Sequence, residues 1–463
     1  MLSTVLPALP ATAAPAAPPA NNDHASHGKQ PSSPPSGHMK ELFLDEDRFE
    51  MLSGPAKTAL ERRFGSRYAE VAPNTDPLAT PLAPTDVPTL VNDPSVDTTA
   101  RDTQSETTIA LAGPNIVTSF NDSGSFNSNN HFTGWSTAPT SSPTFTDNGI
   151  LPASTEGDAG DPVIAVDSVT NRVYLVTLGF TTGENLQVFR SDTNGLSFAA
   201  PVNATPGYAG SGTFQDKEWI AVDNNPGTGQ GNVYIAWRTF PSSSGGGIRF
   251  TRSTDHGDTW GPTLGTTISS VSSVQGAYVV VGTDHSVSVF YFQAGALMVT
   301  KSTDFGVTFA SPVQVTTIAA SGTNGDLGLG GGFRTSAFPT AAVNPVNGNL
   351  YVVWNDRGAS TDKADVFLTR STDGGATWSP RVRVNDDAGL NDQFMPTLAV
   401  SPDGSRVFFG WYDRRNDPTN LGIQRFGSVA SVDGGTGAVT TGPSFAMSPM
   451  FPVVVGQDPN INT

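Results

Sequence analysis

Charged side chains stand directly before or after short apolar strands at several distant places in this chain. Asp161, Asp216 and Glu218 precede such strands, whereas Arg238 follows one. Carboxyl groups in these positions are candidates for proton transfer, and a guanidinium group binds a carboxylate through two parallel hydrogen bonds. The chemistry requires that segments far apart in the sequence meet at one place. The elements that carry these residues therefore decide whether a site exists.

A short apolar strand recurs six times at intervals of 55 to 62 residues. Its marker residues are Leu111, Val166, Val222, Val281, Val343 and Val400. Each copy is followed by a turn and a second apolar strand, and Asn347-Gly348 is one of the dipeptides that tight hairpins require. A repeat of this length suits one four-stranded sheet, which buries both faces only by stacking against its neighbours. We therefore predict an all-β fold, a six-bladed β-propeller of four-stranded antiparallel blades.

A second pattern, S-x-D-x-G-x-T followed by Trp or Phe, occurs late in three repeats, at 253–260, 302–309 and 371–378. We expect Asp255, Asp304 and Asp373 to accept hydrogen bonds from backbone N–H and hydroxyl groups within hairpin turns. The glycine takes a positive φ, and the aromatic ring packs into its own blade. The role of these three carboxylates is thus structural, at turns opposite the loops that enter the inner strands.

With these three motifs at blade spacing, the chain resembles the bacterial neuraminidase repeat, or Asp-box, proteins of the sialidase superfamily. The resemblance covers about residues 106–445. It is specific for the fold and much less so for activity, because Asp-box propellers include sialidases, other glycosidases and proteins that only bind. It implies a site at the end of the central channel, where the loops that enter the inner strands meet the loops that leave the second strands.

The resemblance also implies roles for residues in these loops. Sialidase-like chemistry uses arginines that hold the sugar carboxylate, an acid that protonates the leaving oxygen, and a tyrosine nucleophile activated by a glutamate. The catalytic candidates are Asp161 or Asp216 as the acid, Tyr412 as the nucleophile and Glu218 as its base. The substrate-binding candidates are Arg238, Arg357, Arg414, Asp356 and Asp413.

A structural interpretation of the same residues stays open. Asp-Arg pairs at matching positions of adjacent blades also form ion pairs that tie a ring together. Sialidases carry an early arginine in a [F/Y]-R-I-P stretch, which this sequence lacks, and Arg101 is its nearest substitute. We therefore predict a sialidase-like exo-glycosidase, with a non-catalytic propeller that binds glycans or other surface ligands as the alternative. A structural or adhesion protein that uses the blade rims is a third class.

Composition excludes several other functions. The net charge of −17, from 25 basic and 42 acidic residues, disfavours nucleic acid and anionic membrane surfaces as partners. There is no cysteine, hence no disulfide, thiolate nucleophile or cysteine-based zinc site. The six histidines form no metal spacing, so no metal and no organic cofactor is expected, although Asp-rich turns such as 385–387 leave calcium possible.

Residues 1–104 differ in composition from the repeats that follow them. Residues 1–38 are rich in Ala, Pro and Ser and are interpreted as an export signal or a flexible segment. Residues 39–104 contain two helical patterns, the second starting at Ser53-Gly54-Pro55, and an extended lead-in. These helices pack on the domain or form a pro-region. Residues 105–463 form the propeller, and we expect a secreted monomer that spans no membrane and acts on a glycan or glycoconjugate.

Overall fold

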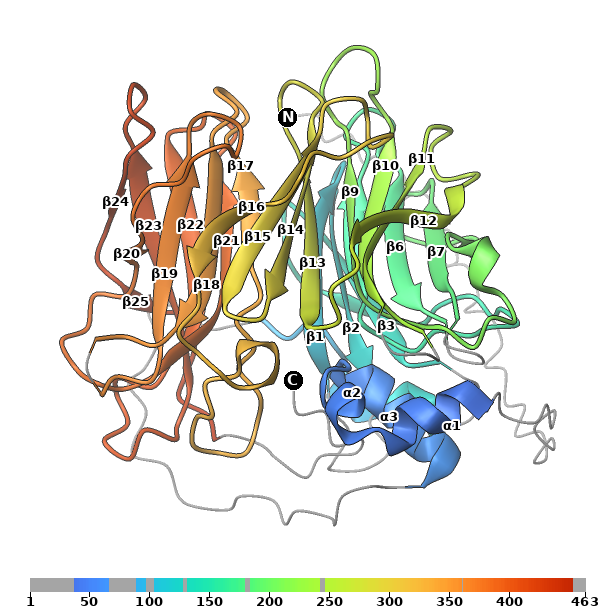
Figure 1. Ribbon diagram of the computed structural model, residues 1–463, viewed down its shortest axis with the longest axis horizontal. Coiled ribbons are helices and arrows are strands. Elements are labelled where there is room, and N and C mark those ends of the chain that lie inside the picture. The colour runs from blue at the N-terminus through green and yellow to red at the C-terminus, as the bar shows by residue number, and fades with distance from the viewer. Residues whose placement is uncertain are drawn as a thin grey trace, which may run out of the picture. The chain divides into compact units, whose positions relative to one another are not determined.

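The computed structural model describes residues 37–65, 89–96, 104–127, 131–179, 184–241, 246–359 and 361–452. Six antiparallel sheets follow one another along the chain, each with its strands hydrogen-bonded in sequence order, and they are numbered here as blades 1 to 6 (Figure 1). A fifth strand is added to the last sheet. The predicted six-bladed β-propeller of four-stranded antiparallel blades is therefore confirmed.

Each blade begins with its innermost strand. Blade 1 consists of β1 (Gln104–Ala112), β2 (Asn115–Asp122), β3 (Thr133–Pro139) and β4 (Thr146–Ile150). Blade 2 consists of β5 (Val163–Val166), β6 (Val173–Leu178), β7 (Leu186–Ser191) and β8 (Val202–Asn203). Blade 3 consists of β9 (Phe214–Val222), β10 (Val233–Phe240), β11 (Gly247–Ser253) and β12 (Gly261–Ser269).

The second half of the ring repeats this arrangement. Blade 4 consists of β13 (Val274–Val281), β14 (Val287–Gln293), β15 (Ala296–Ser302) and β16 (Val313–Thr317). Blade 5 consists of β17 (Thr340–Val343), β18 (Leu350–Asp356), β19 (Asp365–Ser371) and β20 (Val382–Arg383). Blade 6 consists of β21 (Gln393–Val400), β22 (Arg406–Asp413), β23 (Gln424–Val432), β24 (Val439–Thr441) and β25 (Phe445–Ala446). Short 3₁₀ helices occupy Pro94–Val96, Gly124–Asn127, Pro206–Tyr208 and Thr323–Gly325.

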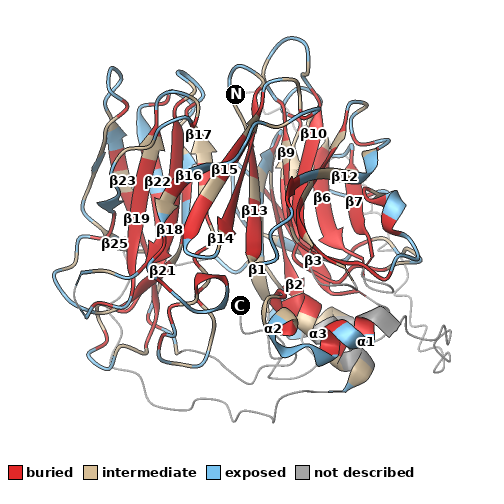
Figure 2. Cartoon of the chain, viewed as in Figure 1, coloured by how far each residue is buried: buried red, intermediate tan, exposed pale blue. Residues whose placement is uncertain are grey.

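The core lies between successive blades rather than within one sheet. Figure 2 shows buried residues in red along most strands of the blades. In a middle blade both faces of the sheet are covered by the neighbouring blades. Trp237, Trp354 and Trp411, on the second strands of blades 3, 5 and 6, are fully buried. Blades 1 and 6 expose more apolar side chains than the middle blades. Ile109 and Leu111 of β1 are 68% and 66% exposed, and Phe408 of β22 is 43% exposed.

The three S-x-D-x-G-x-T turns share one hydrogen-bond pattern. In the first, Asp255 Oδ1 accepts from Ser253 Oγ at 2.7 Å and from Thr259 N at 2.9 Å, and Gly257 has φ +83°. Asp304 and Asp373 accept the equivalent bonds. The expected turn chemistry is thus present.

We expected the aromatic ring of each turn to pack into its own blade, and in two of the three turns the ring also contacts an aromatic ring of the preceding blade. Phe309 of blade 4 lies against Phe250 of blade 3, with ring centroids 4.8 Å apart, and Trp378 of blade 5 lies against Phe290 of blade 4 at 5.9 Å. The aromatic side chain contacts the preceding blade because a single four-stranded sheet buries its faces only against neighbouring blades. The motif therefore joins neighbouring blades.

Three helices precede the propeller: α1 (Gly37–Leu44), α2 (Glu46–Glu50) and α3 (Gly54–Phe64). Ser53 is the N-cap of α3, and its hydroxyl accepts from Ala56 N at 3.3 Å, as the sequence predicted for this helix start. The helices lie together at one end of the blades in Figure 1 and share an apolar cluster with blades 2 and 3. Within the described residues, no helix is long and apolar enough to cross a membrane.

Candidate functional site at the channel mouth

A kink in the innermost strands aims side chains at the channel axis. The pairing of β1, β9, β13 and β21 with their neighbours is interrupted near the start of each strand. A residue in the left-handed region stands at each interruption: Glu106 (φ +49°), Lys217 (φ +50°), Gly276 (φ +66°) and Met395 (φ +49°). Asp161, two residues before β5, has φ +55°. Such bulges redirect a side chain, and non-glycine residues adopt this conformation only where their surroundings enforce it.

Asparagines on the second strands hold two of these kinks in place. Asn121 of blade 1 accepts a hydrogen bond from the Asp161 amide of blade 2 at 2.8 Å, and Asn355 of blade 5 accepts one from the Met395 amide of blade 6 at 3.0 Å. Both asparagine side chains are buried. The contact fixes the left-handed residue of one blade through the side chain of the blade before it.

The kinks of the first three blades gather a buried cluster of charges. Lys217 Nζ forms an ion pair with Glu106 and lies 3.7 Å from Asp161 Oδ1. Asp216 and Glu218, the residues on either side of Lys217, are 0% and 2% exposed. Neither carboxylate oxygen of Glu218 accepts a hydrogen bond from the described residues. Two of these four carboxyl groups, Glu106 and Asp161, thus contact the single lysine of the cluster.

The electrostatics of this cluster shift the pKa values of its members. Burial, followed by the Asp161 charge, raises the pKa of Glu106 and of Glu218 well above the usual range for glutamate. Burial and Asp161 raise the pKa of Asp216 to about 7. Burial lowers the pKa of Lys217, but Asp161 and Glu106 outweigh this and raise it overall.

A cavity of about 520 Å³ opens beside the cluster at the channel mouth. One part of its wall is aromatic, formed by Phe333, Phe338, Phe394, Tyr412 and Phe451. The charged part of its wall is formed by Glu106, Lys217, Arg334 and Arg425. A lining that combines flat apolar rings with a few polar groups suits a sugar ring, which has apolar faces and hydroxyl edges.

Tyr412 is the one predicted catalytic residue that lines this cavity. Its ring contacts Phe394 and Phe451, and the Arg425 guanidinium lies 4.7 Å above its centroid. Within the described part of the chain, Arg425 forms no ion pair with a carboxylate. No contact joins Tyr412 to Glu218 among these residues. The structure therefore places the tyrosine in the wall and the glutamate in the charge cluster.

Asp161 and Glu218 belong to the cluster, but Asp216 has another partner. Its Oδ2 accepts from the Ser53 amide at 3.0 Å and its Oδ1 from the Ser53 hydroxyl at 2.5 Å. Asp216 therefore caps α3, where a carboxylate is favoured by the helix dipole. Both residues considered for the acid contact residues of the cavity wall, Asp161 through Lys217 and Asp216 through Ser53 and Gln275.

The structure does not bring the three predicted arginines together. Arg238 is buried beside Phe240 and donates to Ser272 O at 2.8 Å, and burial lowers its pKa to about 10. Arg414 is buried and donates to Asp392 Oδ2 at 3.1 Å and Gly330 O at 2.7 Å. Arg357 is exposed, one residue beyond the end of β18. The cations that face the cavity are instead Lys217, Arg334 and Arg425.

Asp356 and Asp413 form hydrogen bonds with neighbouring protein groups and do not line the cavity. Asp356 accepts from the amides of Ala319 and Ala320 and from Arg381 Nη1 at 2.9 Å. Asp413 accepts from Trp411 Nε1 at 2.8 Å and from Arg415. Their oxygens are directed into the blades rather than into the cavity, which favours the ion-pair interpretation for these two residues.

Glu106 was not among the predicted site residues, yet it lines the cavity and belongs to the cluster. The sequence did contain a signal for it. Gln104, Gln215 and Gln393 each stand two residues before a left-handed residue, Glu106, Lys217 or Met395. Aligning the repeats on these glutamines would have placed Glu106 beside Lys217.

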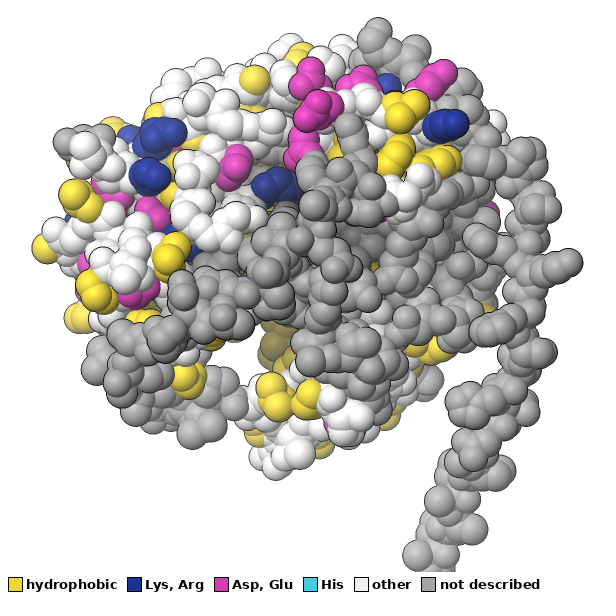
Figure 3. All heavy atoms as spheres, turned by 90° about the horizontal axis from the view of Figure 1, so that it is seen from below, with side chains coloured by type: hydrophobic (Ala, Val, Ile, Leu, Met, Phe, Trp, Pro, Cys, Tyr) yellow, Lys and Arg dark blue, Asp and Glu magenta, His cyan; other side chains and the backbone are white. Residues whose placement is uncertain are grey.

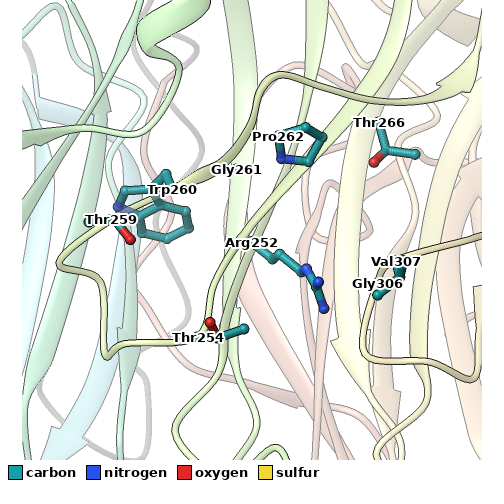
Figure 4. A pocket seen from close by; sticks show the side chains of 9 residues that line it. All are labelled: Arg252, Thr254, Thr259, Trp260, Gly261, Pro262, Thr266, Gly306 and Val307. Carbon is teal, nitrogen blue, oxygen red and sulfur yellow. The ribbon is translucent and has the colours of Figure 1, made fainter.

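A second cavity, of about 490 Å³, lies at the rim (Figure 4). Thr254, Thr259, Trp260 and Val307 of the S-x-D-x-G-x-T turns of blades 3 and 4 line it together with Arg252. Arg252 donates to Phe305 O at 2.9 Å, and Trp260 is only 8% exposed. The site therefore contains neither a cluster of carboxyls nor an exposed aromatic face. Across the described ranges, no group of three or more His, Asp or Glu residues is arranged to hold a metal ion.

Comparisons with known proteins find similar solved structures at low sequence identity. No protein-family model matches the chain, and no curated protein matches it. A protein of unknown function from Dyadobacter fermentans shares 14% identity, with 77% of this chain and 96% of that chain covered and a TM-score of 0.46. The intramolecular trans-sialidase from Ruminococcus gnavus, in complex with oseltamivir carboxylate, shares 13% identity over 71% and 93%, with a TM-score of 0.46.

Two further solved structures are longer than the region they match. The Hadza microbial sialidase Hz136 shares 16% identity, with 66% of this chain and 63% of that chain covered and a TM-score of 0.43. A sialidase from Trypanosoma rangeli shares 13% identity over 68% and 53%, with a TM-score of 0.44. The aligned region thus spans about half to two thirds of these two sialidases.

Proposed function

We propose that this protein is an exported, sialidase-like exo-glycosidase that acts on glycans at the channel mouth. The observation that carries the proposal is the pair of carboxyls, Glu106 and Asp161, that contact one lysine, Lys217, beside an aromatic-walled cavity. Glycoside hydrolysis needs one carboxyl that holds a proton and one group that supplies negative charge. Burial raises the pKa of Glu106, which suits this carboxyl to hold the proton.

Glu106 is the general acid in this proposal. It lines the cavity, its pKa is raised, and its proton lies next to the space where a leaving oxygen would stand. Lys217 contacts both Glu106 and Asp161 and limits the repulsion between the two carboxyls. After the proton has moved to the leaving group, Lys217 also stabilises the carboxylate that remains.

Tyr412 remains the proposed nucleophile, since it is the tyrosine in the cavity wall. Arg425 above its ring, together with Arg334, takes the place of the expected arginine clamp and would hold an anionic group of the sugar. Glu218 stays within the buried cluster, where burial raises its pKa and favours its neutral form.

A glycan-binding protein without catalysis is the second candidate. The burial of Arg238 and Arg414 and the exposure of Arg357 favour it, because none of these groups is available to hold a sugar carboxylate at one point. In that case the aromatic wall would bind the sugar, and Glu106 and Asp161 would only stabilise the hub.

Turnover of a panel of fluorogenic glycosides, sialosides included, tests the proposal. We expect Glu106→Gln and Tyr412→Phe to lower kcat about a hundredfold or more. Tyr278→Phe, on the inner strand of blade 4 outside the cavity, serves as the control and should retain wild-type turnover. Glycan binding with no turnover of any substrate would support the second candidate instead.

A further inference from the structure

The helical segment before the propeller is held by the polar groups of the channel mouth. Its residues Met51, Leu52 and Ser53 connect α2 to α3, and all three line the cavity. Helix ends leave carbonyl and amide groups without partners inside the helix. Here the propeller supplies those partners, so the mouth recognises the main chain of this connection.

Four side chains from different parts of the propeller make these contacts. Arg334 Nη1 donates to Glu50 O at 3.0 Å and to Leu52 O at 2.8 Å. Met51 O accepts from Gln275 Nε2 at 2.9 Å and from Asn324 Nδ2 at 3.2 Å. Asp216 accepts the Ser53 amide and hydroxyl, and Gln275 also donates to Asp216 at 2.8 Å. We call Asp216, Gln275, Asn324 and Arg334 the cradle.

Apolar contacts add to the recognition. Phe49, Leu52 and Ala56 are completely buried and Leu60 is 1% exposed, in a cluster shared with blades 2 and 3. Arg48 donates to Pro241 O at the end of β10. The segment is therefore bound as a peptide ligand would be, with main-chain hydrogen bonds at its centre and buried side chains on both sides.

We propose that the cradle is a peptide-binding site whose internal ligand is the segment Asp45–Phe64, and that this ligand restricts access to the charge cluster. The inhibitory part rests on the proposed function, whereas the peptide-binding part does not. A tethered ligand competes at a high effective concentration. In the wild-type protein the internal segment therefore occupies the cradle most of the time. The apparent affinity for a peptide added from outside is lowered in proportion to the fraction of molecules whose cradle is free.

The test compares two full-length proteins with one synthetic peptide. The peptide has the wild-type sequence of residues 45–64 and a fluorescent label. Ser53→Asp, in the full chain, places a carboxylate against Asp216 and releases the internal segment by like-charge repulsion. Ser142→Asp, in an exposed turn of blade 1, is the charge-matched control. Far-ultraviolet circular dichroism and thermal melting confirm that each protein is folded.

We expect the Ser53→Asp protein to bind the peptide at least tenfold more tightly than wild type or the Ser142→Asp control. Adding Gln275→Ala should reduce this binding, whereas adding Gln314→Ala, on the exposed edge strand of the same blade, should not. A folded Ser53→Asp protein that fails to bind the peptide, or wild type that binds it equally well, would overturn the proposal.

Glycoside turnover then separates the two proposals. Turnover that rises in the Ser53→Asp protein and falls again when the peptide is added supports inhibition by the segment. Unchanged turnover with bound peptide contradicts inhibition. If no glycoside is turned over by any form while the peptide binds as expected, the proposed function fails and the peptide-binding site remains. The chain contains no cysteine, so Leu52→Cys, at a completely buried position, adds an independent readout: its reaction with a thiol reagent should be slow unless Ser53→Asp is present.

Discussion

The side-chain oxygen of Asn121 in blade 1 accepts a hydrogen bond from the amide of Asp161 in blade 2, at 2.8 Å. Asn355 and Met395 repeat this contact between blades 5 and 6, at 3.0 Å. In one pair the held residue is a carboxylate of the charge cluster, and in the other it is a methionine in the cavity wall. The two pairs therefore offer matched substitutions.

We predict that Asn121→Ala and Asn355→Ala each lower the free energy of unfolding by roughly 1–3 kcal/mol, the usual cost of an unsatisfied buried amide. Only Asn121→Ala should also change the pH dependence of turnover, because only Asp161 sets the charge beside Glu106. Urea unfolding and pH–rate profiles measure the two effects. Identical pH profiles in the two variants would show that Asn121 has no role beyond packing.

Glu218 is predicted to destabilise the folded protein at neutral pH. The pKa of Glu218 is higher in the folded protein than in the unfolded chain. The folded protein therefore has its full stability below about pH 4, near the pKa of glutamate in the unfolded chain, and loses stability as pH rises through the folded-state pKa. We expect Glu218→Gln to raise the free energy of unfolding at pH 8 by roughly 1–3 kcal/mol and to have little effect at pH 4. Denaturant titrations at both pH values measure this, with exposed Glu41→Gln as the control. A loss of stability at pH 8 would contradict the assignment.

The arginines lead to opposite expectations. Arg414→Ala removes the partner of buried Asp392 and should cost about 3–5 kcal/mol, as for other buried ion pairs. Arg357→Ala, at an exposed position, should change stability by less than about 0.5 kcal/mol and leave turnover unchanged. Thermal unfolding and kinetics check both. Strong loss of turnover in Arg357→Ala would restore the arginine clamp that the sequence suggested.

The S-x-D-x-G-x-T turns are predicted to serve stability alone. Asp373 accepts from Ser371 Oγ at 2.7 Å, Thr377 N at 2.9 Å and Thr377 Oγ1 at 2.5 Å. Asp373→Ala should therefore lower the free energy of unfolding by roughly 1–2 kcal/mol without changing turnover below the melting temperature. These bonds lower the pKa of Asp373 to about 2, so their contribution is lost as pH falls from about 4 through 2. Altered kcat in a folded Asp373→Ala protein would argue against this division.

Part of this structure could be predicted because the repeat fixes it. The spacing of the marker residues and the S-x-D-x-G-x-T turns led to the number and type of blades, and Ser53-Gly54-Pro55 marked the start of α3 correctly. These features depend on local periodicity and on turn or cap residues, which one sequence displays directly. The boundaries of the three chain regions stay predictions, and residues 1–36 lie outside the described ranges.

The site was less predictable because it depends on side-chain direction. Neighbouring residues in a strand point to opposite faces, so the adjacent residues Asn355 and Asp356 have different partners. Arg357 follows the end of the strand and is exposed. The contact between Ser53 and Asp216 joins residues 163 positions apart, and no local pattern announces it. Glu106 was missed because its backbone kink, rather than its neighbours, aims it at the cavity.

The pairing of strands within the blades and the types of residue near the start of the innermost strands can therefore vary independently. One backbone position near the start of each kinked inner strand faces the axis whatever residue occupies it, as Glu106, Lys217 and Met395 show. Substitution there would exchange acid, base or thioether at the hub while the sheets keep their pairing. Position 276 is the exception, since a Cβ atom would lie 2.4 Å from Phe338 and leaves room for glycine alone. Variation of this scaffold toward other ligands should therefore proceed through blades 1, 2, 3 and 6, with blade 4 held constant.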